Sequence, residues 1–470
     1  MRKNKIILFF VLVYVLGLNY VFCQNNSNIV NWGTEQKILN RIIPPKFPKR
    51  EFNILKFGAV GDGKTDCTNA INNAIKACSE SGGGKVIVPE GVFFTGAIYL
   101  KSNVNLYISK GATLKFSTDP EKYLPVVFTR WEGVECYNYS SLIYAYNESN
   151  IAITGEGLLD GCSSYENWWA WKGTKDNKDT LKPNQKKDRD LLFKMGEDNV
   201  PVENRVFGLG HYLRPNFIQF YKCKNVLISG IKIINSPMWV IHPVLSQNIS
   251  IIRVHVEGFG PNTDGCDPES CKDVLIKDCC FNNGDDCIAI KSGRNNDGRR
   301  VGIPSENIVI KNCTMIEGHG GVVMGSEISG GVRNVFVQNC WMNSPNLDRA
   351  LRFKTNSLRG GLIENIFMKN VKIGQVGGEI LRIDYYYEEG DAGTFTPIIR
   401  NVNMDNIICN EGKYAIWIKA YDRSPVENIT ISNSIFKNIK EENIIENVKS
   451  LNLKNVKINN KLYNIKNFSN

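Results

Sequence analysis

One short pattern recurs along the chain and limits its fold more than any other feature. An asparagine or aspartate is followed by alternating apolar positions, a one-residue break and a second alternating pair, as in NVLISGIKI (225–233) and NIVIKNCTM (307–315). The first apolar positions of the clearest copies are residues 226, 249, 274, 308, 335, 366, 402 and 429, which lie 23 to 36 residues apart. Weaker copies begin at residues 103, 150 and 450. Each copy is too short to fold alone, so neighbouring copies must stack.

The alternation within a copy predicts the architecture of the stack. Side chains that alternate with period two predict a strand, and the one-residue break predicts a bend before a second strand. Further short strands follow in several copies, such as CIAIKSG, GVVMGSE and ALRFKTN. Irregular copy lengths without helical periodicity predict an all-β chain that forms a single right-handed parallel β-helix, with coils about 4.8 Å apart. Helical repeats and β-propellers would need helices or evenly spaced four-stranded blades, which this pattern lacks.

The repeat assigns structural roles to several residues. Cys279, Cys313 and Cys340 share the third apolar position, so we expect them to stack inside the coils as small hydrophobic side chains. The residues that open most copies are expected to form a ladder of side-chain amides: Asn225, Asn248, Asn307, Asn334, Asn365, Asn401 and Asn428. Asn248 and Asn428 also match the N-glycosylation sequon, but the ladder explains both of them better.

The N-terminal region predicts export. Residues 1–23 have the form of a signal peptide, with positively charged MRKNK before apolar IILFFVLVYVLGL. Gly17 and Asn19 interrupt the apolar run before it reaches spanning length, which argues against an uncleaved anchor. We therefore predict a secreted or periplasmic protein with no stable membrane span, lipid anchoring through Cys23 being a minor alternative. Residues 24–50 are predicted to be a leader segment, and residues 51–470 the β-helix domain.

Two segments depart from the repeat. Residues 65–81 (TDCTNAINNAIKACSES) predict an amphipathic helix that caps the open N-terminal end of the β-helix. The apolar face of this helix contains Ala70, Ile71, Ala74, Ile75 and Cys78. Residues 159–215 form an insertion that contains WWAW (168–171) and a charged run from Lys172 to Lys194. The insertion is interpreted either as a solvated loop or as one wall of a binding groove.

Composition restricts the partners. The chain has 14 cysteines, and removal of Cys23 with a signal peptide leaves an odd number, so at least one thiol is unpaired in a monomer. The net charge of +10 favours an acidic partner. Nucleic acid is a poor candidate, because the chain has no basic stripe interleaved with aromatic residues. The oligomeric state is left open, with a monomer as the default.

Charged residues recur at one turn of the repeat. Asp285 and Asp286 lie 11 and 12 residues after the first apolar position of their copy, and His319 lies 11 residues after that of the next copy. Asp264 occupies the corresponding connection one coil earlier. We therefore expect these four side chains to converge on adjacent coils.

Two cations are expected beside this acidic turn. Arg352 and Lys354 alternate on the strand one coil later, so they project from the same face. The three carboxylates, the imidazole and the two cations together would span roughly 15 Å of stacked coils. Crowded carboxylates retain a proton, which gives a protonated acid beside an ionised base, as hydrolysis of a glycosidic bond requires. The cations would bind a negatively charged sugar.

Four short motifs stand in order along this face: NTD (262–264), GDD (284–286), GHG (318–320) and RFK (352–354). With them the chain resembles the polygalacturonases of glycoside hydrolase family 28. The resemblance extends from FGAVGDGKTD (57–66), which other pectin-lyase-like β-helices share, to about residue 440. It implies an inverting hydrolase that cleaves α-1,4-galacturonosidic bonds of an acidic pectic polysaccharide or oligogalacturonide. It also implies that the reaction needs no metal or other cofactor.

The resemblance also implies a role for each site residue. Asp285 would protonate the leaving oxygen, Asp264 with Asp286 would activate the attacking water, and His319 would tune the acid. The residues that would bind substrate are Arg352, Lys354 and Tyr387, with Tyr386 as an alternative to Tyr387 in IDYYYE (383–388). His242 is expected either to line a subsite or to be a buried, hydrogen-bonded histidine.

The mode of action is less constrained. GHGG followed by VVMGSE, and Lys291 beside the acid pair, resemble the exo-acting branch of the family more than the fungal endo-enzymes. We therefore expect exo-action and include Lys291 among the substrate-binding residues. The alternatives are an endo-polygalacturonase and a xylogalacturonan or rhamnogalacturonan hydrolase. A lyase that uses carboxylate-bound Ca²⁺ and a non-catalytic β-helix adhesin or carbohydrate-binding protein are the other hypotheses.

Overall fold

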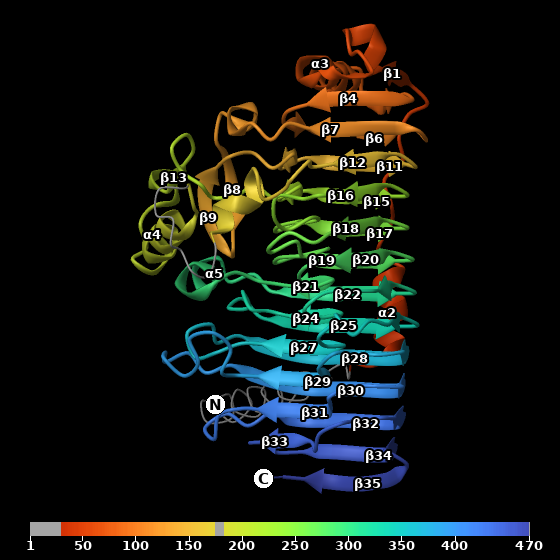
Figure 1. Cartoon of the computed structure of the whole chain (residues 1–470), viewed down its shortest axis with the longest axis vertical. Helices are drawn as coiled ribbons and strands as arrows, with labels where there is room; N and C mark the ends of the chain where they lie inside the picture. Colours follow the sequence, from red (N-terminus) through yellow and green to blue (C-terminus); the bar gives the residue numbers. More distant parts are fainter. Residues whose placement is uncertain (1–29, 174–182, 470) are drawn as a thin grey trace, which may run out of the picture.

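The computed structural model describes residues 30–173 and 183–469. The signal peptide predicted at residues 1–23 lies outside this range. The described chain winds into a long stack of parallel strands, which runs vertically in Figure 1 with the N-terminal coils at the top. The predicted β-helix is confirmed. None of the described helices is long and apolar enough to cross a membrane.

Three columns of strands run along the stack. The first column contains β1 (Glu51–Asn53), β3 (Gly84–Val88), β6 (Val104–Ile108), β11 (Ser149–Gly155), β15 (Lys224–Ser229), β17 (Gln247–Ile252), β19 (Lys272–Lys277), β22 (Ser305–Lys311), β25 (Val332–Gln338), β28 (Leu362–Ile373), β30 (Ile398–Cys409), β32 (Glu427–Phe436) and β34 (Leu451–Ile458). The second contains β2 (Asp62–Asp66), β4 (Gly91–Thr95), β7 (Ala112–Phe116), β12 (Leu158–Asp160), β16 (Lys232–Ile234), β18 (His255–Gly258), β20 (Cys280–Asn283), β23 (Thr314–Met315) and β26 (Trp341–Met342). The third contains β21 (Ile288–Ile290), β24 (Val322–Met324), β27 (Leu351–Lys354), β29 (Glu379–Asp384), β31 (Tyr414–Lys419) and β33 (Ile444–Glu446). A final strand, β35 (Lys461–Phe468), pairs antiparallel with β34.

The register predicted from the repeat is confirmed. Parallel pairing aligns the first apolar positions of successive copies in one unbroken row: Val226, Ile249, Val274, Ile308, Val335, Ile366, Val402 and Ile429. The weak copy at residue 450 continues this row, because Leu451 pairs with Ile429. All of these side chains are buried. The hydrophobic interior is therefore a continuous column along the stack.

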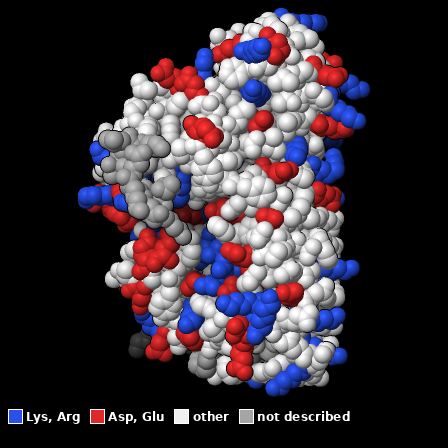
Figure 2. All heavy atoms as spheres, viewed as in Figure 1, with Lys and Arg blue, Asp and Glu red and all other residues white. Residues whose placement is uncertain are grey.

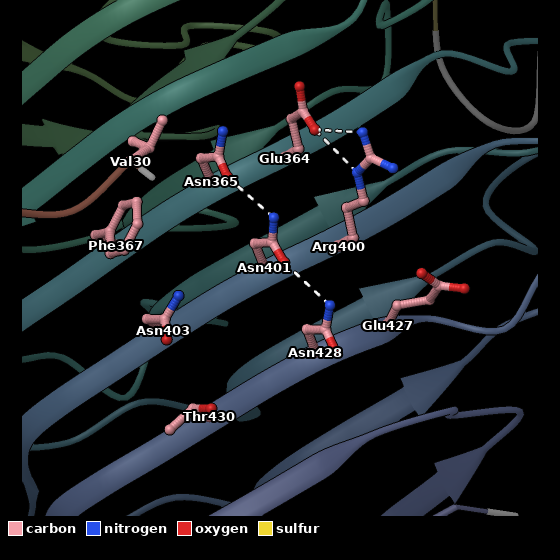
Figure 3. A pocket seen from close by; sticks show the side chains of 10 residues that line it. All are labelled: Val30, Glu364, Asn365, Phe367, Arg400, Asn401, Asn403, Glu427, Asn428 and Thr430. Carbon is pink, nitrogen blue, oxygen red and sulfur yellow. Dashed lines mark hydrogen bonds and ion pairs between the residues drawn. The ribbon is translucent and has the colours of Figure 1, made fainter. Parts of the chain in front are cut away.

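The predicted asparagine ladder is also present. Side-chain amides of Asn334, Asn365, Asn401 and Asn428 each bond to the asparagine one coil earlier, at 3.0 to 3.2 Å. Figure 3 shows the last three of these residues in line. Each has a φ between 55° and 59°. Asparagine tolerates this left-handed conformation better than most residues, so it both makes the bend and pairs the coils.

The cysteines behave as small hydrophobic residues. Cys279, Cys313 and Cys340 are buried within the stack, as the repeat predicts. The cysteines of the described residues are all free thiols. The hydrophobic column therefore replaces disulfides as the source of stability in this part of the chain.

The predicted capping helix is α3 (Thr68–Glu80). Its buried residues are the five that the sequence placed on its apolar face: Ala70, Ile71, Ala74, Ile75 and Cys78. They join the main hydrophobic core at the N-terminal end of the stack (Figure 1). The helix therefore covers apolar surface that the first coil would otherwise expose.

The leader contains a helix that the sequence analysis missed. Helix α2 (Trp32–Leu39) lies against β19 and β22, on the outer face of the central coils (Figure 1). The Trp32 ring makes edge contacts with Phe336 and Phe367, with ring centroids 5.5 and 6.0 Å away. Arg41 forms an ion pair with Asp273 at 2.7 Å. The segment before the first strand therefore packs on coils that lie far along the sequence.

The insertion at residues 159–215 is partly helical. The charged run interpreted as a loop contains the end of η3 (Trp168–Lys172) and most of α4 (Lys186–Glu197). Leu192 of α4 packs with Trp131 and Trp239 in a small separate core. Few other α4 side chains are buried, so the helix has only a weak amphipathic pattern in the sequence.

A hairpin stands beside this insertion. Strands β8 (Val127–Trp131) and β9 (Val134–Asn138) pair antiparallel, and β13 (Val206–Phe207) joins β9. Together with α4 and α5 (Asn295–Val301) they project from one side of the stack in Figure 1. The remaining strands form a separate small parallel sheet: β5 (Ile98–Tyr99), β10 (Ile143–Tyr146) and β14 (Ile218–Tyr221).

The ladder generates a stability prediction at Asn365. Asn365→Ala removes two amide hydrogen bonds and places a Cβ-bearing residue without a polar side chain at φ 59°. We expect the free energy of unfolding to fall by about 2–4 kcal/mol. Asn365→Gly relieves the backbone strain and should cost about half as much. Denaturant midpoints of the two variants measure the difference, and wild-type midpoints in both would contradict the ladder's role.

Candidate active site

Connections between strands bring the predicted acids together. Asp264 follows β18, Asp285 and Asp286 join β20 to β21, and His319 joins β23 to β24. Because successive coils are in register, these connections stack on one another. One carboxylate oxygen from each of the three aspartates lies within 4.8 Å of the others. The structure thus gathers the four residues that the repeat placed on one turn.

Asp286 is a buried carboxylate held by two cations. Lys354 Nζ lies 2.6 Å from Asp286 Oδ2, and Arg352 Nη1 lies 3.5 Å from Asp286 Oδ1. Both cations extend from alternate positions of β27, whose intervening residue Phe353 is buried in the core. A fully buried carboxylate needs such compensation to remain charged. Lys354 and Arg352 therefore stabilise a negative charge on Asp286.

Asp285 and His319 form an ion pair. His319 Nδ1 lies 3.0 Å from Asp285 Oδ1, and the imidazole is about half exposed. The hydrogen bond to Asp285 raises the pKa of His319 to about 9. Burial pushes the pKa of Asp285 upward, but the hydrogen bond and charge of His319 outweigh it and hold that pKa below the usual range. In the free site the proton of this pair therefore lies on His319, whereas the resemblance to family 28 implied that Asp285 is the proton donor.

Asp264 has the opposite environment. Its side chain is buried, and its Oδ1 has no hydrogen-bond donor within reach among the described residues. Burial, followed by the charge of Asp285, raises the pKa of Asp264 well above its usual value. The proton that a crowded cluster must retain therefore lies on the Asp264 side of the site rather than on Asp285.

Lys291 is surrounded by carboxylates. Its ammonium lies 3.1 Å from Glu327, 3.6 Å from Asp267 and 3.7 Å from Asp264. It also lies 4.3 Å from the centroid of the Trp239 ring. Only 3% of the side chain is exposed. The residue predicted to bind substrate thus borders the pocket but directs its charge toward the protein's own acids.

Tyr387 belongs to the cationic side of the site. Its ring centroid lies 5.5 Å from the Arg352 guanidinium and 5.3 Å from the Lys354 ammonium. Tyr386, the alternative from the sequence, is about half exposed and packs against Tyr421. The structure therefore places Tyr387, and not Tyr386, beside the two cations.

His242 does not reach the pocket, which corrects the subsite interpretation. Its side chain is fully buried, with Nε2 2.8 Å from Glu269 and Nδ1 2.9 Å from the Asn216 amide. Burial lowers the pKa of His242. The other interpretation from the sequence, a buried and hydrogen-bonded histidine, matches this environment.

The non-repeating segments form the wall of the pocket. Glu132 of the β8–β9 hairpin and Lys172 and Arg189 of the insertion line it opposite Asp264 and Asp285. Arg189 Nε contacts Glu132 at 2.8 Å. Figure 2 shows acidic and basic side chains gathered in a hollow between this projecting part and the body of the stack. Sequence analysis offered the charged run that contains Lys172 and Arg189 as one wall of a groove, and these two residues line the pocket. It did not single out any of the three residues, because no repeat supplies a register for them.

Cations of the protein offset part of the charge of the acidic cluster. Its three aspartates lie close enough to hold a cation. Lys354 and Lys291, however, already supply positive charge to them from within the protein. Among the described residues, a larger hollow on the outer face of β28, β30 and β32 contains no such cluster. Its ionic groups form ion pairs, Glu364 with Arg400 (Figure 3) and Glu427 with Lys449. The pocket that contains the three aspartates is therefore the better candidate for the active site.

Carboxylates in different environments beside fixed cations, on a parallel β-helix, are an arrangement that suits an enzyme of the glycoside hydrolase class. The sequence profile of glycosyl hydrolases family 28 matches residues 208–458, and a rhamnogalacturonase A/epimerase, pectate lyase-like profile matches residues 51–118. A probable polygalacturonase of Vitis vinifera is 30% identical over 400 residues, which are 81% of this chain and 73% of that protein. The chain belongs to glycoside hydrolase family 28 and is an enzyme.

Two further relatives are informative. An exo-poly-alpha-D-galacturonosidase of Dickeya chrysanthemi is 29% identical over 370 residues, which are 73% of this chain and 59% of that protein. The crystal structure of a hyperthermoactive exopolygalacturonase from Thermotoga maritima is 50% identical, with a TM-score of 0.89, and the match covers 92% of this chain and 96% of that one. The similarity therefore extends over most of the chain and includes its fold.

The ion pair at His319 generates a prediction in the free enzyme. Asp285→Asn removes the charge and the strongest acceptor beside the imidazole. We expect the pKa of His319 to fall from about 9 toward the ordinary value of 6.5. The four histidines of the chain can be followed by NMR, with His319→Gln to assign the signal. An unchanged pKa in Asp285→Asn would contradict the pairing.

Proposed function

We propose that this enzyme is an exo-acting polygalacturonase that hydrolyses α-1,4-galacturonosidic bonds from a chain end, by single displacement with inversion. The observation that carries the proposal is the site itself, in which three aspartates within 4.8 Å of one another lie beside Arg352 and Lys354. The names of the relatives from Dickeya chrysanthemi and Thermotoga maritima support exo-action on galacturonate. Export through a signal peptide at residues 1–23 is part of the same proposal.

The proton donor in this proposal is the Asp285–His319 pair. In the free site the pair holds one proton up to the pKa of His319, about 9. Asp285 contacts the leaving oxygen and delivers the proton, while His319 supplies it through their hydrogen bond. Interacting groups titrate as a pair, so a lowered pKa of Asp285 in the free enzyme is compatible with its acid role.

The water-activating groups are Asp264 and Asp286. A water held between two carboxylates has an acceptor for each of its protons and keeps a lone pair for attack on the anomeric carbon. Lys354 keeps Asp286 charged through the 2.6 Å contact. During attack the new carbon–oxygen bond forms as a proton passes from the water to Asp264, and the glycosidic bond breaks as its oxygen takes the proton from Asp285.

The cationic side binds the carboxylate of the sugar. Arg352 is largely buried, but 11% of its side chain is exposed, so it keeps some access to a substrate carboxylate. Lys354 and Tyr387 lie beside it. A guanidinium binds a carboxylate with directional hydrogen bonds, which favours galacturonate over a neutral sugar.

The pocket wall supports exo-action. Glu132, Lys172 and Arg189 lie across the site from the repeat and derive from segments outside it. A wall at this place restricts how far a polymer can extend past the acid cluster. An endo-enzyme would need a groove that is open at both ends, so a chain end is the better fit.

The direct test is a time course on polygalacturonic acid. We expect new reducing ends without ultraviolet absorption from unsaturated products, and a slow fall in viscosity relative to the bonds cleaved. Asp285→Asn should lower kcat by about 10²–10⁴-fold, whereas Glu156→Gln, an exposed acid away from the site, should keep the wild-type rate.

Other outcomes would overturn parts of the proposal. Unsaturated products together with loss of activity in chelator would indicate a Ca²⁺-dependent lyase. A rapid fall in viscosity would indicate endo-action. Binding without any new reducing ends, or full activity of Asp285→Asn, would contradict a hydrolytic role for this site.

A further inference from the structure

A buried acid behind the pocket has no part in the mechanism just described. Asp267 lies three residues after Asp264, in the same connection between coils, and its side chain is fully buried. It does not line the pocket, whereas Asp264 does. Substrate therefore cannot touch Asp267, and any influence on the reaction must pass through a neighbour.

The hydrogen-bonding geometry around Asp267 is incomplete. Neither of its carboxylate oxygens, nor Oδ1 of Asp264, has a hydrogen-bond donor among the described residues. The two carboxyl groups lie close enough to form a hydrogen bond with each other. Ionised carboxylates only accept hydrogen bonds, so such a bond requires one proton between them.

Full ionisation of both acids is the alternative, and the surroundings oppose it. The nearest cation is Lys291, 3.6 Å from Asp267 and 3.7 Å from Asp264, and it also serves Glu327 at 3.1 Å. One shared ammonium cannot compensate two adjacent buried charges as well as a third. Burial raises the pKa of both acids, and the charge of Asp285 at Asp264 and of Asp264 at Asp267 raises each pKa further.

We propose that Asp264 and Asp267 share one proton, which lies on Asp267 and is donated to Asp264. Asp267 is then a positioning residue that keeps Asp264 ionised and oriented as the acceptor of the water's proton. The proposal rests on the proposed function for the role of Asp264, although the shared proton itself does not.

The location of the proton follows from access to solvent. Asp264 lines the pocket, whereas Asp267 is fully buried behind it. Water in the pocket can stabilise a negative charge on Asp264, so the proton of the pair lies on Asp267. The charged and titratable groups that face the two acids are Asp285, Asp286, Lys291, Lys354, Arg214 and the thiols of Cys266 and Cys287.

The number of protons on the Asp264–Asp267 pair can be followed through the reaction. Before attack the pair holds one proton, on Asp267. The attacking water gives one proton to Asp264 as its oxygen bonds to carbon, and the pair then holds two. Asp264 returns that proton to solvent after the product leaves, while Asp285 regains a proton through His319.

Infrared spectroscopy of the free enzyme tests the shared proton without substrate. We expect the wild type at neutral pH to show the carbonyl band of a protonated carboxylic acid, and Asp267→Asn and Asp267→Ala to lack it. Absence of the band from the wild type, or its persistence in both variants, would overturn the proposal. This result stands even if the enzyme proves to act on another substrate, so it separates failure of this inference from failure of the proposed function.

The acid limb of the pH profile of kcat/KM tests the role of the donor. Asp267→Ala removes the hydrogen bond to ionised Asp264, so the limb should move up by about one to two pH units. Asp267→Asn has no charge but keeps an N–H donor, so it should return the limb toward that of the wild type. KM should change less than about twofold in both variants, because Asp267 lies outside the pocket.

Two results would contradict this role. If Asp267 normally carried a charge, Asp267→Asn would relieve repulsion and move the limb to lower pH. If Asp267 were only structural, Asp267→Ala would lose stability with the limb unmoved. Lys291→Met supplies a second variant, since loss of the cation should raise the pKa of Asp264 and move the limb to higher pH; an unmoved limb there would also count against the proposal.

Discussion

In-register stacking of parallel coils is the constraint on which the rest of this structure depends. Each apolar row and each asparagine amide repeats at the same place in successive coils, so the hydrophobic column and the ladder enforce one alignment. A slip of one residue would move apolar side chains to the outside. Because the alignment extends to the connections, Asp264, Asp285 and His319 converge although 55 residues separate the first from the last.

The buried site contains more carboxylate groups than surroundings without water can stabilise in the charged form. The protein answers in three ways: Lys354 holds Asp286 ionised, His319 holds Asp285 ionised, and Asp264 belongs to a protonated pair in our proposal. The three partners therefore give three chemically identical side chains different access to a proton. Hydrolysis requires this difference, since a proton donor and a proton acceptor must coexist within a few ångströms.

The repeat made the stack, its register, the ladder, the cap and the convergence of the acids predictable, because each follows from local periodicity. Other features depend on contacts that periodicity does not encode. Trp32 packs on Phe336, some 300 residues away, and Leu192, with Phe193 and Met195 beside it, joins α4 to a small separate core. The burial of His242 beside Glu269 was one of two interpretations that its sequence context left open. Asp267 was overlooked because its partner is another acid.

The central claim is single displacement by a water held between Asp264 and Asp286, and the geometry makes it testable. One oxygen of each aspartate lies within 4.8 Å of the others, whereas acid and base in inverting glycosidases are usually roughly 6.5–9.5 Å apart. The decisive measurement is the anomeric configuration of the first product released from an α-linked oligogalacturonide, followed by ¹H NMR before mutarotation. Our account predicts the β-anomer. Initial release of the α-anomer would contradict it and would make one of these aspartates a nucleophile.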